Sequence, residues 1–143
     1  MSSAVETRPR AHALIASAAL IWNLIGLALF VMQARMSPAD VAALPPPDRA
    51  VFEATPGWLL ALFGIAVVTG VLASLALLLG LRWAAPVFAV SLGAVVLQTI
   101  GAFLVTPNWQ SYGAVSLILP IVLITIGAAL YRYAVRRARC LAT

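Results

Sequence analysis

Few residues of this chain carry side chains suited to catalysis or metal binding. There is a single histidine, His12, and a single cysteine, Cys140. A cysteine and a histidine act as a catalytic pair when a third group orients the histidine, and neither an acid nor a known motif accompanies these two. A zinc site needs three or four converging His, Cys or carboxylate ligands. The sequence therefore predicts no catalytic residues, no metal site, no cofactor and no enzyme, with His12 at a membrane boundary.

A second set of polar residues, Trp22, Asn23 and Gln98, lies within long apolar segments. An amide in hydrocarbon leaves several groups unpaired, so Asn23 and Gln98 should point toward other helices. One interpretation is an intramembrane polar site, with the Trp22 ring as a stacking face and the two amides as hydrogen-bonding groups. The alternative, which we prefer for the amides, is that they hold helices together, because such contacts recur throughout membrane bundles.

The amino-acid composition indicates the class of protein to which these candidate residues belong. Of 143 residues, 64% are hydrophobic and 9% are charged, and the mean hydropathy is +1.06. A soluble domain has about 25% charged residues. This composition excludes an ordinary cytosolic domain, a disordered chain and a disulfide scaffold, and it predicts a membrane protein. The net charge of +5 comes from arginines at the ends of apolar segments, so it reports topology and not nucleic-acid binding.

Charged residues divide the chain into apolar spans. Asp, Glu, Lys and Arg are absent from 11–34, 54–81 and 83–131. A spanning helix needs about 20 residues, so the last segment holds two spans, which the polar turn cluster at 106–113 separates. We predict one all-α domain over 1–143, an integral membrane bundle of four transmembrane helices. The expected parts are helices near 12–33, 58–81, 83–105 and 113–134, a structured outer loop at 34–57 and a basic tail at 135–143.

The arginines predict the orientation of this bundle. With both termini on one side, Arg35 and Arg49 lie on the other side. The terminal side holds seven arginines, namely Arg8, Arg10, Arg82, Arg132, Arg136, Arg137 and Arg139. Because cytoplasmic loops carry an excess of arginine and lysine, both termini are expected in the cytoplasm. The loop at 34–57 is then extracytoplasmic.

The loop at 34–57 has helix signals of its own. Ser37 is a good N-cap, Pro38 suits the first helical position and Asp40 suits the third. We expect a helix from there to Leu44, and a second helical turn capped by Asp48. These pieces are expected to lie on the membrane surface over the bundle. They could form a lid over a cavity, but a simple connector is the preferred interpretation.

Small residues predict which helix faces meet, since close packing and not apolar burial joins helices in lipid. The expected contact stripes are Ala66, Gly70 and Ser74 in the second span, Ala16, Ala19, Asn23 and Gly26 in the first, and Ser91, Ala94, Gln98, Gly101 and Ala102 in the third. Pro120 falls inside the expected fourth helix, where a proline removes one backbone bond and should kink the helix.

Several short patterns carry a family resemblance. They are Trp22-Asn23-x-x-Gly26, Phe30-x-x-Gln33, Met36-Ser37-Pro38, Leu44-Pro45, Thr55-Pro-x-Trp58 and Gln98. With these the chain resembles a family of small, functionally uncharacterised four-helix proteins of the bacterial inner membrane, often labelled sugar transporters. The resemblance covers about 18–135. It implies the same topology and a location in the bacterial inner membrane.

These observations lead to two functional hypotheses. None of the expected spans contains Asp, Glu, Lys or Arg, whereas proton-coupled carriers keep an ionisable group in the membrane. The first hypothesis is therefore an uncoupled transporter or facilitator subunit for a small, sugar-like solute. The alternative is a structural or accessory protein that binds another membrane protein. The expected partners are the lipid bilayer and either a second copy or another membrane protein, and no nucleic acid.

Overall fold

The computed structural model describes residues 3–142, with side chains from Pro9 onward. Within this range the chain is helical and contains no strand. Its long helices are α1 (Ser3–Ala34), α4 (Gly57–Leu78), α5 (Ala84–Val105) and α7 (Ile118–Leu141). Four helical segments are long and apolar enough to cross a membrane. The predicted helical fold with four potential spans is therefore confirmed.

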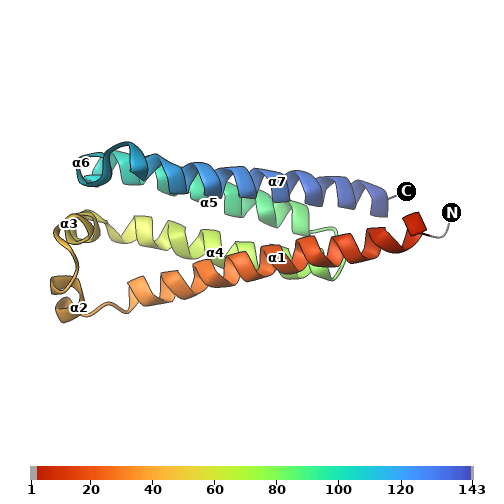
Figure 1. The fold of residues 1–143 in the computed structure, drawn as a ribbon, viewed down its shortest axis with the longest axis horizontal. Coiled ribbons are helices and arrows are strands. Elements are labelled where there is room, and N and C mark those ends of the chain that lie inside the picture. The colour runs from red at the N-terminus through yellow and green to blue at the C-terminus, as the bar shows by residue number, and fades with distance from the viewer. Residues whose placement is uncertain (1–2, 143) are drawn as a thin grey trace.

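The long helices run side by side, with both termini at one end and the short helices α2, α3 and α6 at the other (Figure 1). We call these the terminal end and the cap end. α4 packs between α1 and α5, and α7 packs on the other side of α5. Between α1 and α7 the described residues make little backbone contact. The bundle is therefore a series of four helices whose first and last members are not packed tightly together.

The turn from α4 to α5 depends on Gly80. The Leu81 amide donates to the Ala76 carbonyl (2.8 Å), and the Gly80 amide donates to the Leu77 carbonyl (3.1 Å). This pair of bonds is the Schellman motif, which needs a left-handed residue after the helix, and Gly80 has φ of 71°. α4 therefore ends at Leu78, three residues before the predicted end at 81.

The fourth span does not begin as predicted. The polar cluster at 106–113 folds into α6 (Asn108–Tyr112), and a 3-10 helix, η1, follows over Gly113–Leu117. α7 starts only at Ile118, so Pro120 is its third residue. The prediction that Pro120 lies in a helix interior is wrong. In the first turn its missing N–H costs little, and the tighter 3-10 geometry of η1 precedes it.

Two helices extend beyond their predicted bounds. α1 begins at Ser3 and not near residue 12, although the apolar candidate span itself begins at Pro9. α7 continues to Leu141, through most of the segment 135–143 that was expected to be a tail. Arginine and alanine are both good helix formers, so the helix continues after the apolar sequence has ended.

The connection between α1 and α4 contains two short helices, as predicted. α2 (Pro38–Ala42) has the expected Ser37 N-cap, in a capping box with Asp40. α3 (Pro46–Ala54) begins after Pro45, so Asp48 lies in its first turn and is not its cap. The Tyr112 hydroxyl donates to Asp48, which ties α3 to α6. The cap end is therefore a small structured assembly of three helices.

Replacing Ser37 with alanine should raise the pKa of Asp40. The backbone amide and hydroxyl of Ser37 donate to the Asp40 carboxylate at 2.8 and 2.7 Å. These bonds hold the pKa of the Asp40 carboxyl below its ordinary value. They therefore stabilise α2 fully at pH values above the ordinary pKa, and this stabilisation is lost as the pH falls through the lowered pKa. Carboxyl-carbon NMR titration of the whole protein in micelles should show a partial rise, because the backbone amide remains.

The control for this titration is Thr55→Ala, since the Thr55 hydroxyl bonds the Val51 carbonyl in α3 (2.7 Å) and does not contact Asp40. It should leave the Asp40 titration unchanged. An Asp40 pKa that stays the same or falls in Ser37→Ala would show that the capping box does not form.

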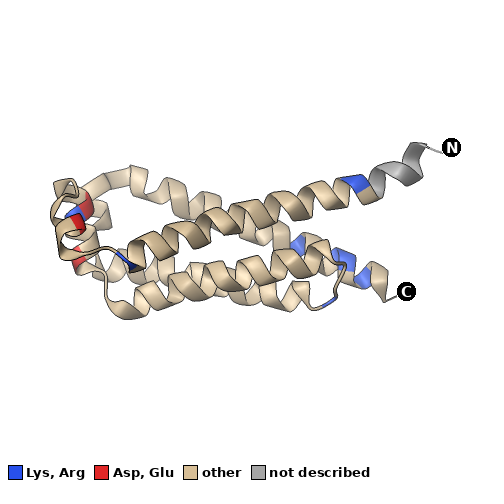
Figure 2. Cartoon of the chain, turned by 90° about the horizontal axis from the view of Figure 1, so that it is seen from below, with Lys and Arg blue, Asp and Glu red and all other residues tan. Residues whose placement is uncertain are grey.

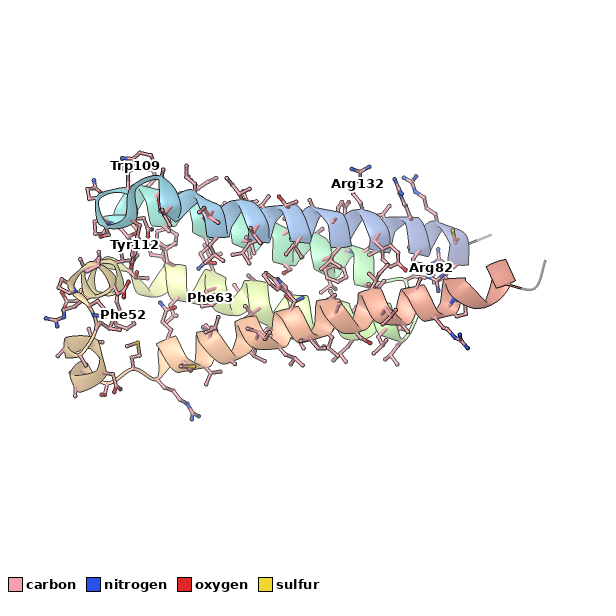
Figure 3. All side chains as sticks on the ribbon, in the orientation of Figure 1. Phe52, Phe63, Arg82, Trp109, Tyr112 and Arg132 are labelled. Carbon is pink, nitrogen blue, oxygen red and sulfur yellow. The ribbon has the colours of Figure 1, made fainter. Side chains whose placement is uncertain are left out.

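Charged residues lie at the two ends of the bundle (Figure 2). At the cap end, Asp40 belongs to α2, Asp48, Arg49 and Glu53 belong to α3, and Arg35 directly follows α1. The remaining arginines in the figure lie toward the terminal end. The side chain of Arg8 is outside the described residues. Trp109 and Tyr112 are at the cap end, whereas Arg82 and Arg132 are toward the terminal end (Figure 3). The long middle of the bundle is uncharged.

Candidate functional site

A cluster of small and polar residues joins α1, α4 and α5. The Asn23 amide donates to the Ala19 carbonyl in its own helix (2.9 Å) and to the Ser74 hydroxyl of α4 (3.2 Å). Ser74 in turn donates to the Gly70 carbonyl (2.8 Å), and Ser91 of α5 donates to the Ala66 carbonyl of α4 (2.7 Å). The Asn23 side chain therefore joins α1 to α4 by a hydrogen bond.

Gly70 allows this cluster to form. A Cβ atom at Gly70 would lie 2.0 Å from the Asn23 side-chain oxygen and 3.3 Å from the Ser91 hydroxyl. The predicted small-residue stripes meet here, with Ser74 fully buried and Ala66 and Ser91 buried. Small side chains let these backbones approach closely, as is typical of membrane helix interfaces.

A groove of about 510 Å³ lies along the side where α1 and α7 are apart. Trp22, Asn23 and Gln98 all line it, so the structure brings the three sequence-predicted residues to one cavity. Most of the lining is apolar, from Phe63 and Val67 of α4, Phe88 and Val95 of α5, and Leu119, Leu123 and Ile126 of α7. The groove is a cavity for an apolar or amphipathic body, with a few polar groups.

The three predicted residues differ in their hydrogen bonding. Asn23 uses both amide hydrogens within the protein. The Gln98 side chain is half-buried, and no side-chain hydrogen bond to it is found among the described residues. Trp22 lines the groove and is 37% exposed. The residue best placed to bond a ligand is therefore Gln98.

His12 closes the terminal end of the bundle. Its Nε2 lies 2.9 Å from the Leu77 carbonyl of α4, and because a carbonyl can only accept, Nε2 carries the hydrogen. Its Nδ1 lies 2.9 Å from the Tyr133 hydroxyl of α7, which donates to it in the neutral ring. The two rings stack with centroids 5.9 Å apart. His12 is buried, and it connects three helices. Its expected position at a membrane boundary stays a prediction.

Catalytic and metal-binding groups do not converge in the part of the chain that the structure describes. No group of three or more His, Cys, Asp or Glu side chains there is arranged to hold a metal ion. Cys140 is exposed near the end of α7, while the partners of His12 are Tyr133 and Leu77. The groove, which Trp22, Asn23 and Gln98 line, is the candidate site.

Sequence reasoning missed Gln33 as a site residue. It lines the groove near the end of α1 and is half-buried. Its position between an apolar segment and Arg35 resembles an ordinary helix boundary, which explains why it was not selected. The available signal was its spacing: Asn23, Gly26 and Gln33 are at i, i+3 and i+10, which lie on one face of a helix with 3.6 residues per turn.

Comparison of the chain with models of protein families, with curated protein sequences and with solved structures found no match in any of the three. The family resemblance described from short sequence patterns therefore stays a prediction, and the interpretation of the groove depends on its own residues.

Proposed function

We propose that the chain is a multi-pass protein of the bacterial inner membrane, with both termini in the cytoplasm and the cap end outside. The distribution of arginine supports this orientation, since Arg82 and Arg132 lie toward the terminal end and the positive-inside rule assigns the arginine-rich end to the cytoplasm. The family resemblance supports the bacterial inner membrane.

Within that membrane, the proposed function is a transporter or facilitator subunit for a small, uncharged, sugar-like solute, which the groove binds. The observation that carries the proposal is the half-buried Gln98 amide in an apolar groove, because an unpaired amide there is costly and a hydroxyl-bearing solute would pair it. Trp22 would supply a stacking face. None of the residues described as lining the groove is ionisable, so a charged solute would find no counter-charge.

The direct test is flux through proteoliposomes with Gln98→Leu. Asn23→Leu is a poor variant for this purpose, because it would also remove the bond to Ser74. Uptake of a labelled hexose and of a labelled polyol should be measured with wild-type protein and Gln98→Leu. A lost hydrogen bond contributes about 1–1.5 kcal/mol, so we expect flux to fall about tenfold.

The matched control is Leu97→Ile, because Leu97 is exposed on the same helix and does not line the groove. It should transport like the wild type. Equal flux in all three proteins, or no flux in any of them, would contradict the facilitator function.

The second candidate function is that of a structural or accessory protein that binds another membrane protein. The observation that favours it is the apolar majority of the groove lining, with Phe88, Val95 and Leu123, which also suits a transmembrane helix. Crosslinking in native membranes discriminates the two: a specific heteromeric adduct through the groove, together with absent flux, supports the accessory role, and recovery of monomer alone contradicts it.

A further inference from the structure

A second cavity lies at the cap end. It has a volume of about 580 Å³ and is formed by the end of α1 together with α2, α3 and the residues between them. Its polar lining includes Arg35, Asp40 and Asp48. We call it the vestibule. Phe52 belongs to the vestibule and Phe63 to the groove, and both lie toward the cap end in Figure 3.

The vestibule and the groove share two lining residues, Leu29 and Gln33. Gln33 is the polar member of this pair and is next to the last residue of α1. The side chains of Leu29 and Gln33 therefore lie where the two cavities adjoin.

A second glutamine amide, that of Gln98, lines the groove further from the cap end. Gln98 is seven residues from the end of α5 at Val105, which is about 10 Å at about 1.5 Å per residue. Among the described residues no side-chain hydrogen bond pairs either Gln33 or Gln98, and both are half-buried. Unpaired amides in hydrocarbon cost several kcal/mol, so two of them in succession indicate a path that contains water or a polar ligand.

The path ends before the terminal end. The groove continues past Gln98 as far as Ser91 and Phe88 of α5, and the Asn23–Ser74 bond joins α1 to α4 beside it. Further along, the core is closed, with Ala16 and Ala73 fully buried and His12 bonded to both α4 and α7. The terminal end of the bundle is thus closed, whereas the vestibule lies at the cap end.

We propose that the vestibule and the groove form one water-filled binding site with access from the cap end, and that Gln33 at their junction selects uncharged solutes that form hydrogen bonds. The solute class rests on the proposed function, whereas the path does not. A charged solute finds both signs of charge in the vestibule, at Arg35 and Asp48. Beyond Gln33 the mostly apolar walls replace part of its hydration shell, and no lining residue there supplies a counter-charge. An uncharged solute meets no such barrier.

Cysteine labelling tests the path. In a Cys140→Ser background, single cysteines replace Gln33 and Gln98, and Val31 and Leu97 serve as controls because they are exposed on the same helices and line neither cavity. Membrane fragments, open on both faces, are treated with an uncharged hydroxyethyl methanethiosulfonate and with its charged trimethylammonium counterpart. These reagents react with thiolate, which forms in water.

We expect the uncharged reagent to modify Gln33→Cys and Gln98→Cys at least about tenfold faster than the control cysteines, because a thiol in hydrocarbon stays protonated. The charged reagent should modify Gln33→Cys at a comparable rate and Gln98→Cys about as slowly as Leu97→Cys. In Gln98→Cys protein, a bulky Gln33→Trp substitution should abolish the fast reaction, and Val31→Trp should preserve it.

Each result decides a different part of the proposal. If Gln98→Cys reacts no faster than Leu97→Cys, the path is overturned even if solute flux exists. If the charged reagent reaches Gln98→Cys as fast as the uncharged one, or Gln33→Trp does not block labelling, selection at Gln33 is overturned. Fast labelling without solute flux would support the path and contradict the proposed transport function instead.

Discussion

Replacing Gly70 with alanine is expected to destabilise the folded protein by about 2–3 kcal/mol, the range for inserting a methyl group into a packed core. The new Cβ atom would lie 2.0 Å from the Asn23 oxygen and 2.7 Å from Asn23 Cγ. Asn23 cannot turn away without breaking its bonds to Ala19 and Ser74. Either the helices separate or these bonds are lost. Reversible unfolding in mixed micelles of SDS and a mild detergent measures the change.

Gly93→Ala is the matched control, because a Cβ atom at Gly93 meets no atom within 4 Å. Since alanine favours helix over glycine by about 1 kcal/mol, this variant should be as stable as the wild type or slightly more stable. Adding Asn23→Ala to Gly70→Ala should recover part of the loss, because the clash disappears. Equal stability of Gly70→Ala and Gly93→Ala would refute the packing of Asn23 against Gly70.

The second large effect is expected at His12. His12→Ala removes the bonds to Leu77 and Tyr133 and leaves a void among three helices, so we expect a loss of about 2 kcal/mol. The Leu77 carbonyl keeps a partner in the Gly80 amide, whereas the Tyr133 hydroxyl loses its acceptor. The same unfolding measurement applies.

Tyr133→Phe separates the two bonds of His12. It removes the hydroxyl that donates to Nδ1 and leaves the bond to Leu77, so its cost should be about 1 kcal/mol. Tyr131→Phe is its control, because Tyr131 is exposed on the same helix. His12→Ala at wild-type stability, or equal effects of the two tyrosine variants, would show that this contact does not hold α1 to α7.

Much of the fold can be predicted from the sequence because charged residues are excluded from hydrocarbon. The uncharged segments 11–34, 54–81 and 83–131 contain most of the helical segments that could cross a membrane. Hydropathy does not predict how far a helix continues beyond its apolar segment. The start of α1 at Ser3 and the end of α7 at Leu141 therefore differ from the predicted bounds. The α4 end at Gly80 did carry a local signal, since glycine after a helix is a common cap.

The site was only partly predictable. Trp22, Asn23 and Gln98 are conspicuous because polar groups in apolar spans need partners. The sequence does not reveal that Asn23 finds its partner in Ser74 while Gln98 lines an open groove. That distinction depends on the spacing between α1 and α7, which is set by packing among all four helices. Gln33 became relevant only when the vestibule and the groove were found to share it.

The serial order of the helices has a consequence for how the protein is made. α1 packs on α4, α4 on α5, and α5 on α7, so each later helix that emerges during synthesis finds the helix on which it packs already made. The bonds that Asn23 and Ser91 make to α4 can all form once α5 has been made. The contact of His12 with Tyr133 joins the first long helix to the last, so it forms only after most of α7 has been made.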